Sequence, residues 1–343
     1  MKNEFDLSII IPSRNCKHAS RTVEDIVENA TGSYQIIVVL DNYWPVPELK
    51  DHKNLTIIHK SVVAGLRKNV NLAVSIAKGK WIMKCDDHCM FGKGFDEILQ
   101  EDMQDDWLVN PSRYALDAEN WIKGRGPTEY LFITYPYVTD NLYGNGLHGK
   151  KWIGEDGFGK NMGIDQFYWM ENARKDHLID DMMTFQGSCW FMGREKYLEI
   201  GGLDEKHCDL MENEPQELGF KVWLSGGRCV VNKKTWYAHM HKSEREKDAH
   251  GRTWRLSYNA MRETGRFQTW YWMNDMWPKA IRNMEWFVNH FPLMPSWPSN
   301  WKEDKIRYEK ENPDKCTNFK IFDPKGVDSL PLPDHIKTVP YAE

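Results

Sequence analysis

The sequence contains no apolar run long enough to cross a membrane. In its 343 residues, no stretch approaches the roughly 20 apolar residues that a spanning helix needs. The first residues, Met-Lys-Asn-Glu-Phe-Asp, lead into an apolar run at 7–11. This start is too short and too acidic for a signal peptide. We therefore expect a protein without a membrane span that acts in the cytoplasm.

Paired cysteines and an excess of positive charge are also missing. The 7 Cys are odd in number and none are spaced as C-x-x-C, so they form no disulfide framework and suit a reducing compartment. A formal net charge of −5 argues against a wholly basic nucleic-acid binder and leaves room only for a local basic patch. With 28% charged and 41% apolar residues, the composition is that of a globular protein with a substantial core.

The turn after the first predicted strand lacks glycine. Strand 7–11 runs into Pro12-Ser13-Arg14-Asn15, whereas a Rossmann dehydrogenase has a Gly-rich turn there. Hydride transfer is set aside on this ground. A sugar-phosphate nucleotidyltransferase shares a doubly wound sheet and an acid-bound metal, but it too needs a Gly-rich, basic phosphate loop at this point, so it is the weaker alternative.

The N-terminal part does contain alternating strands and helices. Four short apolar runs predict buried strands, at residues 7–11, 36–40, 55–58 and 81–83. Helical spacing predicts a helix behind a Ser20 cap and another before the fourth strand. This order predicts an α/β fold with a mainly parallel, doubly wound sheet and helices on both faces. Ligands of such sheets bind beyond the carboxyl ends of the strands, where Asp41 and Asp86 lie.

The chemistry is concentrated in Lys84-Cys-Asp-Asp-His-Cys-Met90, directly after the fourth strand. Asp86 and His88 are two residues apart, so both side chains can point to one face. A carboxylate oxygen and an imidazole nitrogen aimed at one point suit a borderline divalent cation and leave coordination sites open for a substrate. The alternative is a surface loop with an acid pair.

The middle of the chain gives weaker signals. Residues 96–183 have poor periodicity and many Gly, Tyr and Trp residues, which is typical of binding loops or of an insertion. Residues 215–224 predict a helix with proline near its first position. Glu214 and Glu217 lie at its start.

The last third is basic, aromatic and then proline-rich. A strand at 228–232 precedes Ala238-His-Met-His-Lys242, which brings His239 and His241 as further candidate ligands. Between 233 and 266, nine Lys or Arg stand against four Asp or Glu. We expect residues 246–343 to form a helical, Trp-rich extension with a Pro-rich tail.

Four stretches together resemble glycosyltransferases of the GT-A fold, family 2-like and of the polypeptide N-acetylgalactosaminyltransferase type. They are residues 8–15, 36–42, 65–72 followed by 85–89, and 187–223. The third is similar to the family's Gly-Leu-x-Arg helix and Asp-Ser-His-Cys metal motif. The fourth parallels the block in which Glu-Asn-x-Glu precedes Ser-Phe-Arg-x-Trp.

The resemblance covers roughly residues 5–245 and implies a catalytic domain over 1–245. Within it, 1–95 would be the nucleotide-binding half, 96–183 irregular loops and 184–245 the acceptor-side half. It implies transfer of a sugar from a UDP-sugar with the help of Mn²⁺ or Mg²⁺, which acts as a Lewis acid on the departing diphosphate.

The resemblance also assigns residues. Asp86, His88 and His239 match the metal ligands, and His241 is the rival to His239. Contacts with the nucleotide or the donor sugar carry over to Pro12, Arg14, Asp41, Arg67, Lys68, Asp86 and Asp87. Asp41 would hold the uracil, and Asp87 would face away from the metal and touch the ribose or the sugar.

Three positions depart from the family pattern. Lys68 and Val70 stand where the family usually has arginines, which alters the expected nucleotide contacts. Pro215 stands where inverting family 2 enzymes place Asp as general base, so we expect a retaining transferase. Glu214 is the first candidate for contact with sugar or acceptor and Glu217 the second, unless both are first-turn acids favoured by the helix dipole.

We expect the acceptor to be either a glycan or peptide, or a hydroxymethylated pyrimidine in DNA. Basic residues interleaved with aromatic ones suit sugar stacking or an unstacked base beside a phosphate backbone. Arg252, Arg255 and Arg262 are the residues whose charge reversal tests DNA binding. Alternatively, the Trp residues form the core of a helical extension, or the whole chain is a non-catalytic carbohydrate- or nucleic-acid-binding protein.

Overall fold

The computed structural model describes residues 4–137, 147–151, 174–206, 208, 213–242, 247–253, 258–291, 294, 296–313 and 316. Its main sheet has the order β10-β12-β6-β11-β4-β1-β2-β3, with β5 paired to β12 and β7 to β6. The strands are β1 Phe5–Ser13, β2 Tyr34–Asp41, β3 Leu55–Lys60, β4 Gly79–Cys85, β5 Cys89–Phe91, β6 Trp107–Asp117, β7 Ile122–Lys123, β10 Ile179–Asp181, β11 Cys189–Gly193 and β12 Arg228–His239, while β8 Leu131–Ile133 and β9 Gly149–Lys151 form a second sheet. The helices are α1 Ala19–Asn29, α2 Leu66–Ile76, α3 Phe95–Glu101, α5 Arg194–Glu199, α6 Glu214–Leu224, α7 Tyr258–Met273, α8 Met284–His290 and α9 Trp301–Glu311.

The first four strands pair in parallel, as the apolar runs predict. β1 lies between β2 and β4, and β2 pairs with β3. Consecutive residues of a strand face opposite sides of the sheet, so Ile9 and Ile11 belong to one core cluster and Ile10 to the other, all fully buried. The sequences of these strands are continuously apolar because helices cover both faces of the sheet, so that side chains on either face are buried.

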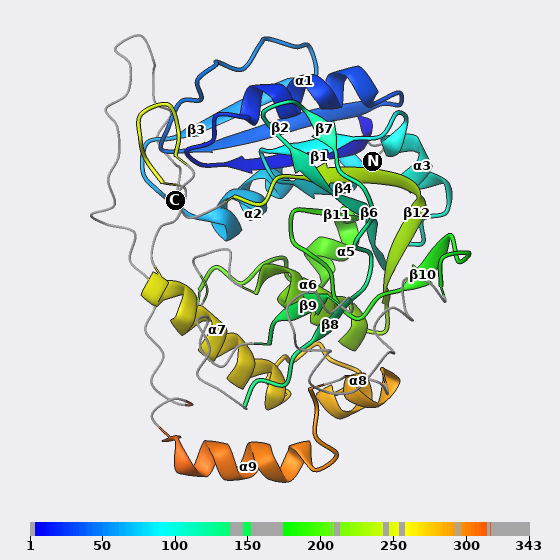
Figure 1. The fold of residues 1–343 in the computed structure, drawn as a ribbon, viewed down its shortest axis with the longest axis vertical. Coiled ribbons are helices and arrows are strands. Elements are labelled where there is room, and N and C mark those ends of the chain that lie inside the picture. Colours follow the sequence, from blue (N-terminus) through cyan, green and yellow to red (C-terminus); the bar gives the residue numbers. More distant parts are fainter. Residues whose placement is uncertain are drawn as a thin grey trace.

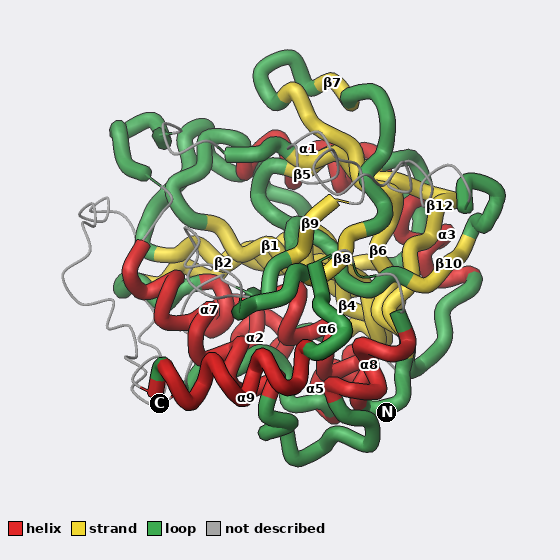
Figure 2. The backbone as a smooth tube through the Cα atoms, turned by 60° about the horizontal axis from the view of Figure 1, so that its bottom comes forward, coloured by secondary structure: helices red, strands yellow, loops and turns green. Residues whose placement is uncertain are grey.

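Helices cover the two faces in separate layers (Figures 1 and 2). α1 and α3 pack on one face, where Val23 and Phe95 join the cluster of Ile9. On the other face α2 and α6 bring Val70 and Trp223 into the cluster of Ile10. Figure 2 shows α2 and α5 to α9 gathered on this second side of the strands.

The sheet as a whole is mixed, because β11 runs antiparallel between β4 and β6. β6 is an 11-residue strand inside the stretch 96–183, which the sequence predicts to be irregular. Polar Asn110 and Ser112 interrupt its apolar pattern, and Pro111 lies beside the point where the register with β12 shifts. A bulge accommodates the missing proline N–H.

The observed starts of the helices agree only in part with those predicted from the sequence. Pro215 lies in the first positions of α6, as predicted. α1 begins at Ala19, two residues earlier than a Ser20 cap would place it; its N-cap is His18, and no side chain caps it. The Ser20 hydroxyl instead donates to the carbonyl of Glu48 at 2.8 Å. The predicted Ser20 cap is therefore wrong.

The described part of the C-terminal third packs on the core beside the sheet. Trp272, Trp277 and Phe287 are buried in the cluster that contains Phe220 and Trp223 of α6. This confirms the interpretation in which Trp residues form the core of a helical extension. Trp254, Arg255 and most of the predicted Pro-rich tail lie outside the described residues.

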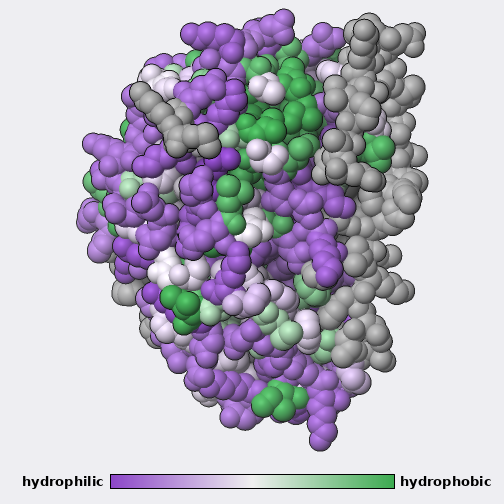
Figure 3. Space-filling model, turned by 180° about the vertical axis from the view of Figure 1, so that it is seen from behind, coloured by the Kyte–Doolittle hydropathy of each residue, from purple (hydrophilic) through white to green (hydrophobic). Residues whose placement is uncertain are grey.

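The surface is mostly hydrophilic on the side shown in Figure 3, with a hydrophobic area near the top of the view. Among the described residues, none of the helices is long and apolar enough to cross a membrane.

Candidate functional site

A cavity of about 380 Å³ opens at the carboxyl ends of β1 and β4, a size usual for ligand pockets. Pro12, Ser13 and Arg14 line it from the end of β1, and Gly65 and Leu66 line it from the start of α2. This is the edge at which ligands of open α/β sheets bind. The cavity thus lies at the end of the sheet where the sequence predicts a ligand.

Asp86, His88 and His239 come together on the wall of this cavity. One possible ligand atom of each lies within 4.8 Å of the others. His239 Nε2 is 3.2 Å and His88 Nε2 is 3.8 Å from Asp86 Oδ2. A cation bound at about 2.1 Å to each atom can span such separations.

Strand pairing explains how residues so distant in sequence meet. Asp86 and His88 lie in the short turn between β4 and β5, and His239 is the last residue of β12. β5 and β12 pair antiparallel, with His239 opposite Cys89. The pairing places the two imidazole rings 4.6 Å apart, measured between ring centroids.

The charge states of this cluster suit a cation. Burial lowers the pKa of His88 and lowers that of His239 to about 4, so both rings are neutral near pH 7 and have a free lone pair. Burial alone would raise the pKa of Asp86, but the Lys84 ammonium and His239 hold it well below its ordinary value. Neutral imidazoles with an ionised carboxylate are the ligand forms that metals require.

His241 also lines the cavity, but its side chain forms a hydrogen bond with Arg113. Its Nε2 lies 3.0 Å from Nη1 of Arg113, which donates to it. His241 is absent from the cluster of Asp86, His88 and His239. The geometry therefore favours His239 as the third member.

Asp87 is directed away from the centre of the cluster of Asp86, His88 and His239. Its Oδ1 lies 2.6 Å from His88 Nδ1 and 3.0 Å from Lys242 Nζ, and its Oδ2 accepts from the Ser13 hydroxyl at 2.6 Å. Burial opposes ionisation, but Lys242 and His88 lower the pKa of Asp87. A carboxylate on Nδ1 fixes the tautomer of His88 that leaves Nε2 free for a metal.

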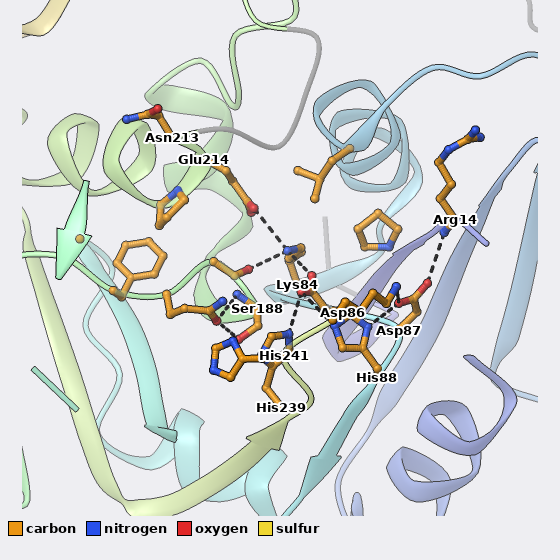
Figure 4. Close-up of a pocket in the computed structure, with 18 of the residues that line it drawn as sticks. Arg14, Lys84, Asp86, Asp87, His88, Ser188, Asn213, Glu214, His239 and His241 are labelled. Carbon is orange, nitrogen blue, oxygen red and sulfur yellow. Dashed lines mark hydrogen bonds and ion pairs between the residues drawn. The ribbon is translucent and has the colours of Figure 1, made fainter. Parts of the chain in front are cut away.

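Lys84 connects the cluster to Glu214. It comes from β4, is almost fully buried, and donates to Asp86 Oδ1 at 2.7 Å, to the Gly187 carbonyl at 2.6 Å and to Glu214 Oε2 at 3.3 Å. Glu214 Oε1 accepts from the Trp190 indole N–H at 2.8 Å. Burial raises the pKa of Glu214. Figure 4 shows Lys84 between the two carboxylates.

The structure does not bring Arg67 or Glu217 into the cavity. Both are buried, form an ion pair with each other, and are absent from the described cavity lining. Glu217 also accepts from Lys221 at 2.6 Å. The structure therefore does not support contact of Arg67 with the nucleotide or of Glu217 with the substrate, because α2 and α6 point these side chains at each other.

Of the other residues predicted to contact the nucleotide, not all line the cavity. Pro12, Arg14 and Asp41 line the cavity, whereas Lys68 is absent from its described lining. The Asp41 carboxylate accepts the backbone N–H groups of Ala64 at 2.7 Å and Gly65 at 3.1 Å. Asp41 thus holds the loop before α2 as well as facing the cavity.

Sequence reasoning gave no site role to several polar residues of the cavity lining, among them Lys84, Asn69 and Asn213. For Lys84 a signal existed, because a lysine inside the apolar strand Trp-Ile-Met-Lys-Cys needs a buried anion as partner. Asn69 and Asn213 lie in stretches 65–72 and 187–223, which carry the family resemblance, but the resemblance was not used to assign either residue a role.

The chain belongs to glycosyl transferase family 2. The family model with that description matches residues 8–199, which is more than half of the chain and includes the β4–β5 turn. A search of curated proteins finds no match.

Two solved structures illustrate what the fold is similar to. GalNAc-T7, in a crystal structure with UDP, GalNAc and Mn²⁺, is 13% identical with a TM-score of 0.55, and the match covers 91% of this chain and 52% of that one. S. aureus TarS 1–349 in complex with UDP is 13% identical with a TM-score of 0.42, and the match covers 70% of this chain and 62% of that one. This chain thus spans about half the length of the GalNAc-T7 chain. The expected α/β fold of GT-A type is confirmed.

Proposed function

We propose that this chain is a glycosyltransferase that uses a UDP-sugar donor and a divalent cation, Mn²⁺ or Mg²⁺, held by Asp86, His88 and His239. The observation that carries the proposal is the convergence of one ionised carboxylate and two neutral imidazoles on the wall of the cavity. GalNAc-T7, which shares the fold, was solved with UDP and Mn²⁺. Three protein ligands leave coordination sites for diphosphate oxygens.

The cation would supply Lewis-acid stabilisation of the charge that develops on the departing UDP. The side chains prepare that position. Asp87 orients His88 through Nδ1, and Lys84 holds Asp86 through Oδ1 so that Oδ2 faces the two rings. Arg14 and Lys242 line the cavity as cations, which suits the approach of a diphosphate.

We further infer that the sugar is transferred with retention. Pro215 stands at the position of the general base in inverting relatives, and proline cannot accept a proton. Glu214 is the carboxylate of α6 that lines the cavity, and Trp190 and Lys84 donate to its two oxygens. We assign it to contact with the sugar or acceptor. The anomeric configuration of the product, read by NMR, tests this, and an inverted product would contradict it.

The deciding experiment is a panel of UDP-sugars assayed for slow donor hydrolysis with and without Mn²⁺. We expect metal-dependent hydrolysis with at least one donor and a loss of about 100-fold or more in Asp86→Ala and His239→Ala. Unchanged hydrolysis in both variants would contradict the assigned site. A non-catalytic carbohydrate- or nucleic-acid-binding protein predicts no hydrolysis with any donor.

The acceptor is a glycan or a hydroxymethylated base in DNA. Arg252 forms an ion pair of 2.9 Å with Asp248, which reduces the positive charge that it offers to a phosphate backbone. This favours the glycan. Salt-dependent retention on DNA that is lost in Arg262→Glu would favour DNA instead.

A further inference from the structure

Two buried amide oxygens of the cavity wall lack a hydrogen-bond partner among the described residues. They are Oδ1 of Asn69, on α2, and Oδ1 of Asn213, the residue before α6. The two side chains are 1% and 4% exposed, and both line the cavity. A buried acceptor left unpaired costs free energy that a suitable ligand recovers.

The orientation of the Asn213 amide follows from its other end. Its Nδ2 donates to the carbonyl of Leu147 at 2.8 Å, and a carbonyl cannot pair with an amide oxygen, so Oδ1 must point elsewhere. The backbone of Asn213 is left-handed, with φ of 56°, a conformation that asparagine tolerates better than most residues. The residue is therefore held in one position.

Figure 4 shows how the site is divided. Arg14 lies on one side of Lys84, and Asn213 and Glu214 lie on the other. Asp86 and His88 lie near Lys84, between these sides. A nucleotide bound on the side of Arg14, with its diphosphate at Asp86, would direct the sugar toward Asn213.

An amide oxygen only accepts hydrogen bonds, so its ligand must donate. Phosphate and carboxylate groups have no proton to donate at neutral pH, whereas sugar hydroxyls and an acetamido N–H do. Glu214 adds a carboxylate to the same side, and the N–H groups of the nearest cation, Lys84, are directed at Asp86, Gly187 and Glu214. The other Lys and Arg side chains of the described lining are Arg14, on the opposite side of Lys84, and Lys242, which donates to Asp87 Oδ1 at 3.0 Å. A negatively charged sugar beside Asn213 therefore lacks a cation of its own.

We propose that Asn69 and Asn213 bind hydroxyl groups of the donor sugar and select a neutral sugar over a uronic acid. This rests on the proposed use of a UDP-sugar and deepens it, because it names the class of sugar and two residues that recognise it.

Calorimetric titration of the full chain at saturating Mn²⁺ tests the proposal with four ligands, UDP, UDP-glucose, UDP-N-acetylglucosamine and UDP-glucuronate. The variants are Asn69→Ala, which suits a helix, and Asn213→Gly, which keeps the left-handed backbone. The control is Asn29→Ala, whose amide donates to the Asp25 carbonyl in α1, away from the cavity lining.

We expect wild-type protein to bind at least one neutral UDP-sugar more tightly than UDP, and UDP-glucuronate more weakly than that sugar. Each cavity variant should lower the affinity ratio of this UDP-sugar to UDP by about 3- to 10-fold, while Asn29→Ala keeps the ratio. Equal losses for UDP and UDP-sugar, or tight binding of UDP-glucuronate by wild-type protein, overturn the inference alone. Wild-type protein that binds no UDP overturns the proposed function and the inference together.

Discussion

Replacing Glu217 by Gln should destabilise the fold and leave the chemistry of the site intact. The Glu217 carboxylate is buried and accepts from Arg67, from Lys221 at 2.6 Å, from the Asp204 N–H at 2.8 Å and from Gln268 at 3.3 Å. The substitution leaves two buried cations without their anion. Removing one partner of a buried ion pair costs about 3–5 kcal/mol, so we expect the free energy of unfolding to fall by about that amount.

The pKa of Glu217 predicts how its contribution to the free energy of unfolding depends on pH. Arg67 and Lys221 outweigh burial and lower the pKa of Glu217 from its ordinary value of 4.5 to about 2. A depressed pKa stabilises the folded state above pH 4.5, and this contribution is lost as the pH falls toward 2. Glu217→Gln should therefore flatten the loss of stability in this range.

Urea unfolding at several pH values measures both effects. Glu195→Gln is the matched control, because its side chain is 87% exposed and its loss should change the unfolding free energy by less than about 0.5 kcal/mol. Donor hydrolysis by the folded fraction of Glu217→Gln should stay within a few-fold of wild type. A stable variant with hydrolysis abolished would refute the structural role and restore Glu217 as a catalytic candidate.

Two further substitutions test the neighbourhood of Glu214. Lys84→Met leaves Asp86 and Glu214 without their shared cation and should lower the unfolding free energy by about 3 kcal/mol; an unchanged urea midpoint would contradict the bridge. Gly187→Ala brings a Cβ to 2.9 Å from Glu214 Oε2 and 3.2 Å from Pro215 Cδ, so we expect about 1–3 kcal/mol of destabilisation. The same change should reduce donor hydrolysis about 10-fold, and wild-type hydrolysis would show that the position of Glu214 is not critical.

The N-terminal half of the fold could be predicted because its strands are short, continuous and apolar. β6 could not, because Asn110, Pro111 and Ser112 interrupt its pattern, and its place in the sheet depends on pairing with β12, far along the chain. Local periodicity carries no information about such a partner.

The candidate site likewise contains residues that the sequence could predict and residues that it could not. The spacing of Asp86 and His88 predicts a shared face. His239 and His241 were both candidate ligands, and only the family resemblance favoured His239, since the β5–β12 pairing that brings it close is a long-range contact. Arg67 and Glu217 were placed in the site because a motif gives residue types and not the direction of a side chain on its helix. Their buried ion pair joins α2 to α6, far apart along the chain.

The central claim is that Asp86, His88 and His239 bind one divalent cation. Its most direct test is a titration of the full chain with Mn²⁺, in which electron paramagnetic resonance measures the free ion. Wild-type protein and His241→Ala should each bind one equivalent at the site, whereas Asp86→Ala, His88→Ala and His239→Ala should lose at least about 10-fold in affinity. Loss of binding in His241→Ala with wild-type binding in His239→Ala would contradict the account.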